Sequence, residues 1–514
     1  MDVLTLLLAV VVVLASVILL GYVYATWTHG MFQQMGIPGP KPGLLGIVNR
    51  YKKEGLAACD QQLVKEYGRV VGVFHGRIPS LLISDPAMIK QICVKDFSNF
   101  VNRSTFGPMT RLVRDCIAEI FDEHWKFMRC VISPTFRTSK LKQMMKLIER
   151  CSDHMVKNMG TYAKEKKSVD MKHLMGFYTM DVIANTGFSI DLDCHSNPDN
   201  VFATYSRSGF TLTYPIIYMF TLMFPFTKFI FEKIDFKVFD FDKDKAKFRD
   251  VVKQVIEDRK NNPDPRYGDI LQTMLDTNKE GVERDSEDDS DEDTETMLDF
   301  KYYKKRGLTN YEIFCNSNIF LFAAFETTSR ALTFTAYNLA THPEIQERLY
   351  QSIIKLLGNR KPTYAEVTKL QYLENVFMET LRLYPPATRT TRLAAKSTII
   401  NGYNIPAGMP IILPVYAIHH DPELWAEPEK FDPDRFLPEN KHELHEYMWI
   451  PFGVGPRNCV AMRLALLEAK MAIVALVQNF RFVVTPETVA PEKLQNGRFL
   501  KPECRIFVGV ERRD

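Results

Sequence analysis

The most informative stretch of this 514-residue chain is PFGVGPRNCVA, residues 451–461. Its two glycines and its proline predict a tight turn that ends at Cys459, and the apolar run Met462 to Val477 predicts a helix directly afterwards. A cysteine at a helix start meets backbone N–H groups and the positive end of the helix dipole, and both favour the thiolate. An anionic sulfur held in this way is a good ligand for haem iron, where it favours cleavage of an O–O bond.

The other eight cysteines show no pattern of this kind. The chain has 9 cysteines in total, an odd number, and they are widely scattered without a CxxC pair. This spacing excludes a disulfide framework and a zinc-knuckle protein, and it predicts a reducing compartment. We therefore interpret every cysteine except Cys459 as structural.

Composition excludes several classes of protein. With 46% hydrophobic and 25% charged residues, the chain is neither disordered nor collagen-like. The net charge of +3 gives no basic excess that would indicate a nucleic-acid partner. Residues 285–295 (DSEDDSDEDTE) contain many acids and no base, so a short acidic run hides a moderately basic body. This run, within a predicted insert at 280–300, should be a flexible, solvated loop.

The N-terminus predicts a membrane anchor. Val3 to Val23 carries no charge, and 21 residues of helix span about 30 Å, the thickness of the hydrocarbon core of a bilayer. Basic residues such as Lys41 and Arg50 follow the segment, whereas only Asp2 precedes it. The positive-inside rule then predicts a single-pass anchor with the body of the protein in the cytosol.

The rest of the chain predicts one large domain. We expect an anchor at 1–28, a linker at 29–50 that contains the turn-forming run IPGPKPG, and a catalytic domain at 51–514. No internal repeat is visible. Phe210 to Phe231 is rich in aromatic residues, but Pro215 and Pro225 interrupt it, so core packing or partial membrane contact is favoured over a second spanning helix. Because the chain already has a predicted anchor, we favour partial membrane contact over plain core packing.

The predicted fold class is mainly α with small β-sheets (α+β). Helical character dominates Ser139 to Val255 and Thr309 to Leu383, with one long helix from about Thr309 to Thr341. Strands are expected in four places: a hairpin at 69–85, a strand-rich stretch at 398–414, and short strands at 480–484 and 505–510.

The loop residues Phe452, Gly455, Arg457 and Cys459 resemble the haem-ligand loop of the cytochrome P450 family. Three further signatures agree in order and spacing: Glu379 and Arg382 with Arg435 in the run PEKFDPDRF, the pair Trp125 and Arg129, and the run AAFETT at 323–328. The resemblance covers about Gly36 to the C-terminus. It implies the cytochrome P450 fold and haem b (iron protoporphyrin IX) as the cofactor.

The resemblance also assigns roles to single residues. Cys459 would be the iron ligand, and Glu379, Arg382 and Arg435 would form a buried structural network beside its loop. Thr327 would orient water and oxygen, and Glu326 would help supply protons. The residues that match the cofactor-binding positions are Arg103, Trp125, Arg129, Arg392, Phe452 and Arg457, with Arg389 as the alternative to Arg392.

Within the family, the tracts WKFMR at 125–129 and FETTS at 325–329 look like the animal microsomal, drug- and steroid-oxidising family three. Two departures stand out: Ala461 and Ala324 occupy places where the family usually has glycine. Each adds a methyl group close to the expected haem, and we expect small packing shifts rather than loss of function.

The resemblance implies a haem–thiolate monooxygenase in the endoplasmic reticulum membrane, with its catalytic domain facing the cytosol. It would hydroxylate lipophilic small molecules, such as xenobiotics, steroids or lipids, in an apolar pocket. Electrons would come from NADPH-cytochrome P450 reductase, with cytochrome b5 as a further candidate partner. Basic residues around Arg457 and Lys470 are expected to dock the acidic reductase.

Two alternatives belong to other functional classes. A lipid-peroxide isomerase of the thromboxane-synthase type needs no electrons, and that relative lacks the helix threonine that Thr327 supplies here. A non-enzymatic haem sensor or carrier would show the thiolate spectrum without turnover of any substrate. The presence of Thr327 favours the monooxygenase.

Overall fold

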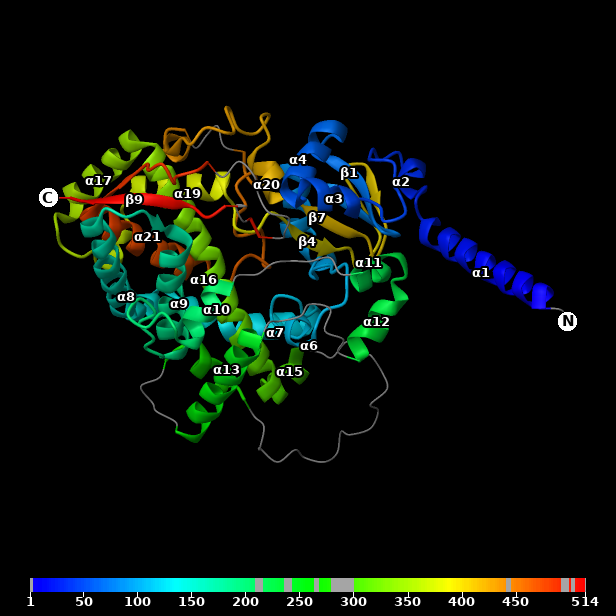
Figure 1. Cartoon of the computed structure of the whole chain (residues 1–514), viewed down its shortest axis with the longest axis horizontal. Coiled ribbons are helices and arrows are strands. Elements are labelled where there is room, and N and C mark those ends of the chain that lie inside the picture. Colours follow the sequence, from blue (N-terminus) through cyan, green and yellow to red (C-terminus); the bar gives the residue numbers. More distant parts are fainter. Residues whose placement is uncertain are drawn as a thin grey trace. The chain divides into compact units, whose positions relative to one another are not determined.

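The computed structural model describes residues 3–208, 216–234, 243–262, 268–278, 300–440, 445–490, 499–500 and 504–513 (Figure 1). The acidic run at 285–295 lies outside the described residues. The chain divides into two compact units. Unit 1 comprises residues 1–111, 212–240 and 389–418, and unit 2 comprises residues 112–211, 241–388 and 419–514.

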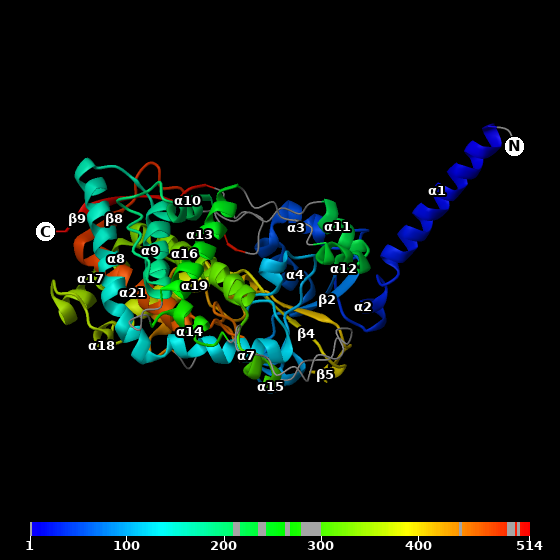
Figure 2. The same cartoon turned by 90° about the horizontal axis from the view of Figure 1, so that it is seen from below.

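The N-terminal helix α1 (Val3–Thr26) has the length and composition of a membrane span. Its apolar side chains are exposed along nearly the whole helix, and Figure 2 shows it as a straight rod beyond α2 (Met31–Gln34). The predicted apolar N-terminal helix is therefore present, and its length and composition would allow it to cross a membrane. Residues of the predicted linker at 29–50 pack inwards, because Phe32, Ile37 and Ile47 are buried.

Unit 1 is built on a four-stranded sheet with the order β1-β2-β7-β4. The predicted hairpin is confirmed as β1 (Val70–His75) and β2 (Ile78–Ile83), which pair antiparallel. Strand β7 (Pro410–Leu413) lies parallel to β2 and antiparallel to β4 (Thr390–Leu393), a strand that the sequence did not indicate.

The first helices of unit 1 complete its core. Helices α3 (Val48–Glu54) and α4 (Leu56–Tyr67) supply Tyr51 and Leu63, which pack with Val71 and Ile412 of the sheet. The remaining elements of this unit are α5 (Pro86–Lys90), α11 (Ile216–Met223), α12 (Phe226–Lys233), and the two-stranded sheet of β5 (Thr398–Ile400) and β6 (Tyr403–Ile405).

The aromatic segment predicted to touch lipid forms the short helices α11 and α12. Each has 8 residues, too few to cross a bilayer. Phe226 and Phe229 are exposed, and Phe224 stacks on Tyr24 of α1 with ring centroids 5.7 Å apart. Residues 209–215 of this segment lie outside the described residues.

Unit 2 is mostly helical, as predicted. Its helices are α7 (Asp122–Ile132), α8 (Thr138–Glu165), α9 (Met171–Phe188), α10 (Val201–Ser208), α13 (Lys243–Asn261), α14 (Ile270–Leu275), α15 (Phe300–Arg306), α16 (Asn310–Thr341), α17 (Pro343–Leu357), α18 (Tyr364–Val367), α19 (Gln371–Leu383) and α21 (Met462–Asn479). Its sheet has the order β3 (Val169–Asp170), β9 (Phe507–Arg512), β8 (Phe480–Val483). Helices α6 (Arg111–Arg114) and α20 (Val415–His419) contain the points where the chain changes unit.

The long helix α16 is the centre of unit 2. It starts with a capping box, in which the Thr309 hydroxyl accepts from the Glu312 N–H and the Glu312 carboxylate accepts from the Thr309 N–H. Helix α9 is buried along nearly its whole length and packs against α16 and α8 (Figures 1 and 2). The stretch 139–255 is thus a set of separate helices, and β3 interrupts it because Val169 and Asp170 pair with β9.

Helix α21 places a carboxylic acid in this core. Glu468 is buried, and burial raises its pKa to about 8, although a hydrogen bond from Thr328 acts in the opposite direction. The Tyr178 hydroxyl donates to the backbone carbonyl of Glu468 at 2.8 Å. The acid is therefore protonated in the folded protein at neutral pH.

Replacing Glu468 with glutamine should stabilise the protein at alkaline pH. The carboxyl ionises near 4.5 when unfolded and near 8 when folded, so its contribution to stability is lost as the pH rises through this window. The advantage of Glu468→Gln should grow by up to about 1.4 kcal/mol per pH unit. Denaturant unfolding at pH 6 and pH 8 measures this, with the exposed Glu487→Gln as control. A pH-independent difference would contradict it.

Candidate functional site

The loop that carries Cys459 is held by its own backbone. The Cys459 N–H donates to the carbonyl of Phe452 at 2.8 Å, and the Asn458 N–H donates to the carbonyl of Gly455 at 3.0 Å. Gly453 and Gly455 have φ angles of 75° and 72°, a conformation that favours glycine. The predicted tight turn is present, and the Cys459 thiol at its end is exposed.

Helix α21 begins at Met462, three residues after Cys459, as the apolar run predicted. Ala461 lies just before the helix with φ −96° and ψ 14°, angles that any L-residue adopts. The alanine at this place therefore causes no backbone strain, and its methyl group is the only difference from a glycine.

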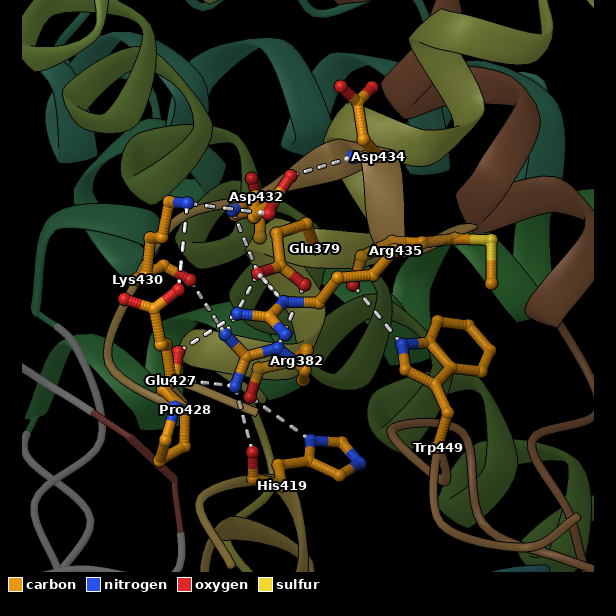
Figure 3. A network of polar contacts seen from close by, with 12 residues as sticks. Glu379, Arg382, His419, Glu427, Pro428, Lys430, Asp432, Asp434, Arg435 and Trp449 are labelled. Atoms are coloured by element: carbon orange, nitrogen blue, oxygen red, sulfur yellow. Dashed lines mark hydrogen bonds and ion pairs between the residues drawn. The ribbon is translucent and has the colours of Figure 1, made fainter. Parts of the chain in front are cut away.

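A buried ion pair on helix α19 forms the centre of a polar network (Figure 3). Arg382 donates from Nε and Nη2 to the two carboxylate oxygens of Glu379, each at 2.8 Å, and both side chains are fully buried. Arg435 Nε donates to the same carboxylate at 3.3 Å, as does the Asp432 N–H at 3.0 Å. The predicted network of Glu379, Arg382 and Arg435 is thus present, with both partners of α19 on one helix face.

The remaining donors of Arg382 join distant segments to this pair. Its Nη1 donates to the carbonyls of His419 at 2.8 Å and Pro428 at 2.7 Å, and its Nη2 donates to the carbonyl of Lys430 at 3.1 Å. An arginine has five N–H donors in a rigid fork, so each one here has a fixed target. The pair therefore positions the backbone of 419–432.

His419 connects this network with the entrance of the cysteine loop. Its Nδ1 lies 3.1 Å from the Arg382 carbonyl, and its Nε2 accepts from the Ile450 N–H at 3.0 Å. Burial lowers the pKa of His419 well below its usual value, so the ring is neutral and can both donate and accept. The neighbouring Trp449 Nε1 donates to the Met378 carbonyl at 3.1 Å (Figure 3). No pattern in the sequence pointed to His419.

Three predicted cofactor-binding residues meet at the cysteine loop. The Arg457 guanidinium lies 4.4 Å from the centre of the Trp125 ring, and Arg129 donates to Asn458 O and Oδ1, each at 2.8 Å. Arg457 also donates to the carbonyls of Ile117 and Ala118. These contacts bring Trp125, Arg129 and Arg457 together, as the spacing predicted.

Arg457 and Lys470 were expected on a surface that docks a reductase, and this expectation is wrong. Arg457 is buried because backbone carbonyls surround its guanidinium, and Lys470 is buried in an ion pair with Glu374 at 2.9 Å. Exposed basic residues close by in the sequence are Lys126, which follows Trp125 on α7, and Arg463 at the start of α21.

Unit 1 holds the other two predicted arginines, Arg103 and Arg392. The Leu393 N–H donates to the Asn102 carbonyl at 2.8 Å, and the Thr391 hydroxyl donates to the Ser104 carbonyl at 3.1 Å, so the two arginines lie on paired segments.

The alternative arginine has another role. Arg389 is paired with the buried Asp60 at 2.6 Å and lies over the Tyr51 ring. This contact ties β4 to α4 within unit 1. Because Arg389 is engaged in this contact, Arg392 is favoured over Arg389 for the predicted cofactor-binding position.

Helix α16 has an uncovered face at its middle. Ala323 is exposed, whereas Phe322, Ala324 and Thr327 are half-buried, although the residues around them in this helix are mostly buried. The Thr327 hydroxyl donates to the Ala323 carbonyl at 2.7 Å. A small-residue face with one hydroxyl in the central helix is suited to a flat apolar ligand.

Glu326 does not share this face. Its carboxylate binds Lys172 Nζ of α9 at 2.9 Å and Arg330 Nε at 2.8 Å, and Lys172 also donates to the Ser329 hydroxyl at 2.7 Å. Burial would raise the pKa of Glu326, but the charges of Lys172 and Arg330 outweigh it, so the pKa is lowered. Arg330 could have been found from its i+4 spacing to Glu326; Lys172 is 154 residues away and gave no signal.

The residues of unit 2 fit a haem. The thiol of Cys459 is exposed at the end of an otherwise fixed loop, and a thiolate is a ligand of haem iron. Trp125, Arg129 and Arg457 gather beside that loop, and side chains of this type suit anionic propionates, although Arg129 bonds to Asn458 and Arg457 bonds to backbone carbonyls in this structure. The uncovered face of α16 adds an apolar surface that carries one hydroxyl, that of Thr327.

Comparisons with known proteins show which family the chain resembles over nearly its whole length. The family model for cytochrome P450 matches residues 36–510. The chain is 39% identical over 508 residues to cytochrome P450 3A41 of Mus musculus, covering 98% of this chain and 96% of that protein. It is 40% identical over 509 residues to cytochrome P450 3A6 of Oryctolagus cuniculus, covering 98% and 97%, and 38% identical over 506 residues to cytochrome P450 3A5 of Homo sapiens, covering 98% and 96%. The resemblance seen in the sequence is confirmed.

Breaking the buried pair should destabilise the protein strongly. In Arg382→Lys, one ammonium replaces a guanidinium with five directed donors. The Glu379 carboxylate then loses one of its two bonds from residue 382, and the protein should lose about 3–5 kcal/mol of unfolding free energy. The unfolding free energy of the full-length protein in detergent measures this. The control is Arg348→Lys, which weakens the exposed pair with Asp434 and should cost less than about 1 kcal/mol. Similar losses in the two variants would contradict the prediction.

Proposed function

Since the chain belongs to the cytochrome P450 family, we propose that it hydroxylates lipophilic small molecules, such as xenobiotics, steroids or lipids. As a member of this family it is a monooxygenase that uses haem. The observation that carries the proposal is the exposed Cys459 thiol at the end of a loop fixed through His419 to the Glu379–Arg382 pair.

The cofactor proposed is haem b, with Cys459 as its iron ligand. When bound, the haem supplies the redox chemistry that inserts one oxygen atom of O2 into the substrate and reduces the other to water. Trp125, Arg129 and Arg457 would hold its propionates, and Phe452 would contact it from the loop; the family resemblance adds Arg103 and Arg392 to the propionate-binding residues. Rigid charged forks suit this task because propionates are anionic.

Thr327 and Glu326 would manage protons. The Thr327 hydroxyl back-bonds to the Ala323 carbonyl and lies on the uncovered face, where it can hold a water molecule. Glu326 is ionised, and its Oε2 accepts from Lys172, whose side chain is 29% exposed. Lys172 Nζ would pass one of its protons to Glu326 Oε2 and then take a replacement from solvent, and water would carry the proton from Glu326 to Thr327.

The protein would act at the endoplasmic reticulum membrane, with α1 as a single-pass anchor and the catalytic domain at 51–514 in the cytosol. The exposed Phe226 and Phe229 next to α1 support additional contact with lipid. Electrons would come from NADPH-cytochrome P450 reductase, with cytochrome b5 as a second partner. Lys126 and Arg463 are the exposed bases that would meet their acidic surfaces.

Replacing Cys459 with serine should abolish the thiolate spectrum. The reduced carbon monoxide complex of the full-length protein should show the thiolate-type Soret band, and Cys459→Ser should lose it because a hydroxyl does not replace the anionic sulfur. Cys130→Ser is the matched control, since Cys130 is also an exposed free cysteine. Survival of the band in Cys459→Ser would overturn the site assignment.

Replacing Thr327 with alanine should separate electron use from product formation. With reductase, NADPH and a steroid that shifts the haem spin state, product per NADPH should fall at least about tenfold, because no hydroxyl holds the water. Thr333→Ala is the control, as Thr333 makes the same back-bond to Ser329 within the buried part of α16. Rearrangement of a lipid peroxide without NADPH would instead indicate the isomerase, and thiolate spectra without turnover would indicate a sensor.

A further inference from the structure

A cluster of potential metal ligands lies in unit 2 away from the cysteine loop. His154 of α8, Asp181 of α9 and Asp193 of the segment after α9 each offer one ligand atom, and these atoms lie within 4.8 Å of one another. We propose that His154, Asp181 and Asp193 form a binding site for a zinc-type divalent metal ion, close to the buried His195.

The spacing of two of the ligand atoms suits zinc. His154 Nδ1 lies 3.3 Å from Asp193 Oδ1. Zinc binds nitrogen and oxygen at about 2.0–2.2 Å in a tetrahedron, which separates neighbouring ligand atoms by about 3.3–3.5 Å. His154 and Asp193 are half-buried, so small rotations of their side chains can close the remaining gap to Asp181.

Asp181 is a buried carboxylate without a strong cation beside it. It is 1% exposed and accepts from the Cys194 N–H at 2.9 and 3.2 Å, and no lysine or arginine pairs with it in the described part of the chain. The nearby Arg150 instead donates to Asn185 at 2.6 Å and pairs with Asp191 at 3.3 Å. Because burying an ionised carboxylate is costly, such groups are usually paired or bind metals.

His195 is the independent observation that points to a ligand. It is 9% exposed, and within the described residues neither of its ring nitrogens has a hydrogen-bond partner. It lies close enough to Asp193 and His154 for their charges to act on it. Imidazole is among the commonest metal ligands in proteins.

The ligand types select among metals. Magnesium and calcium prefer sites made of oxygen atoms alone, whereas imidazole nitrogen with carboxylate oxygen suits zinc and its neighbours. Backbone N–H groups orient both carboxylates, since Asp181 accepts from Cys194 and Asp193 accepts from Ser196 at 3.2 Å. Such outer hydrogen bonds are typical of metal sites because they fix the ligands in place.

Bound metal would connect α8, α9 and the segment at 189–200. Helix α9 is bonded to α16, because the Thr179 hydroxyl donates to the Phe325 carbonyl at 3.1 Å. An ion at this corner should therefore stabilise the helical part of unit 2. The proposal does not depend on haem binding or on turnover.

The test is zinc binding by the full-length, haem-loaded protein after treatment with a chelator. Calorimetric titration with zinc ions should give one site, and His154→Gln and Asp193→Asn should each weaken it at least tenfold. Asp191→Asn is the matched control, because Asp191 is an exposed acid of the same segment outside the cluster, and its affinity should equal that of the unchanged protein.

Thermal unfolding gives a second readout. Zinc should raise the unfolding midpoint of the unchanged protein and of Asp191→Asn, but not that of the double variant His154→Gln/Asp193→Asn, because only a folded site binds the ion. Equal zinc affinity in the unchanged protein and the double variant would overturn the proposal, as would no binding at millimolar zinc or equal binding of magnesium.

Discussion

The buried ion pair of Glu379 and Arg382 is the interaction on which the rest of unit 2 depends. A guanidinium removed from water needs a partner for each N–H. Here the partners are the Glu379 carboxylate of α19 and the backbone carbonyls of residues 419, 428 and 430. These segments must keep this arrangement for every N–H of Arg382 to have its partner. His419 then passes that order to Ile450, so the conformation of the cysteine loop is a consequence of charge burial some 70 residues earlier in the chain.

Features with a local cause could be predicted from the sequence. The turn at 451–461, the hairpin β1–β2 and helix α16 follow from glycine positions, apolar runs and capping, each within a few residues. Strand β4 could not be predicted in the same way, because Thr390–Leu393 is extended only by pairing with β7. Likewise β3 interrupts a helical stretch because β9, more than 300 residues away, supplies its hydrogen bonds.

For the site, too, features with a local cause could be predicted and features that depend on distant partners could not. Trp125, Arg129 and Arg457 meet at the loop as their order in the chain suggested. Burial could not be predicted, and for this reason Arg457 and Lys470 were wrongly placed on the surface: their partners, backbone carbonyls and Glu374, come from other helices and loops. The same holds for Lys172, whose meeting with Glu326 depends on α9 packing against α16.

The end of α1 and the residues after it contact the β1–β2 turn, and these contacts limit how α1 can move relative to unit 1. The Thr28 hydroxyl and the His29 ring contact the carbonyls of Arg77 and Gly76, and the Arg77 guanidinium lies over the Tyr24 ring. The anchor is therefore mounted on the β1–β2 turn rather than joined through a slack tether. With α1 as the proposed membrane anchor, this mounting would leave unit 1 little freedom to tumble above the bilayer, and its search for partners would be confined to two-dimensional diffusion with a nearly constant orientation of unit 1.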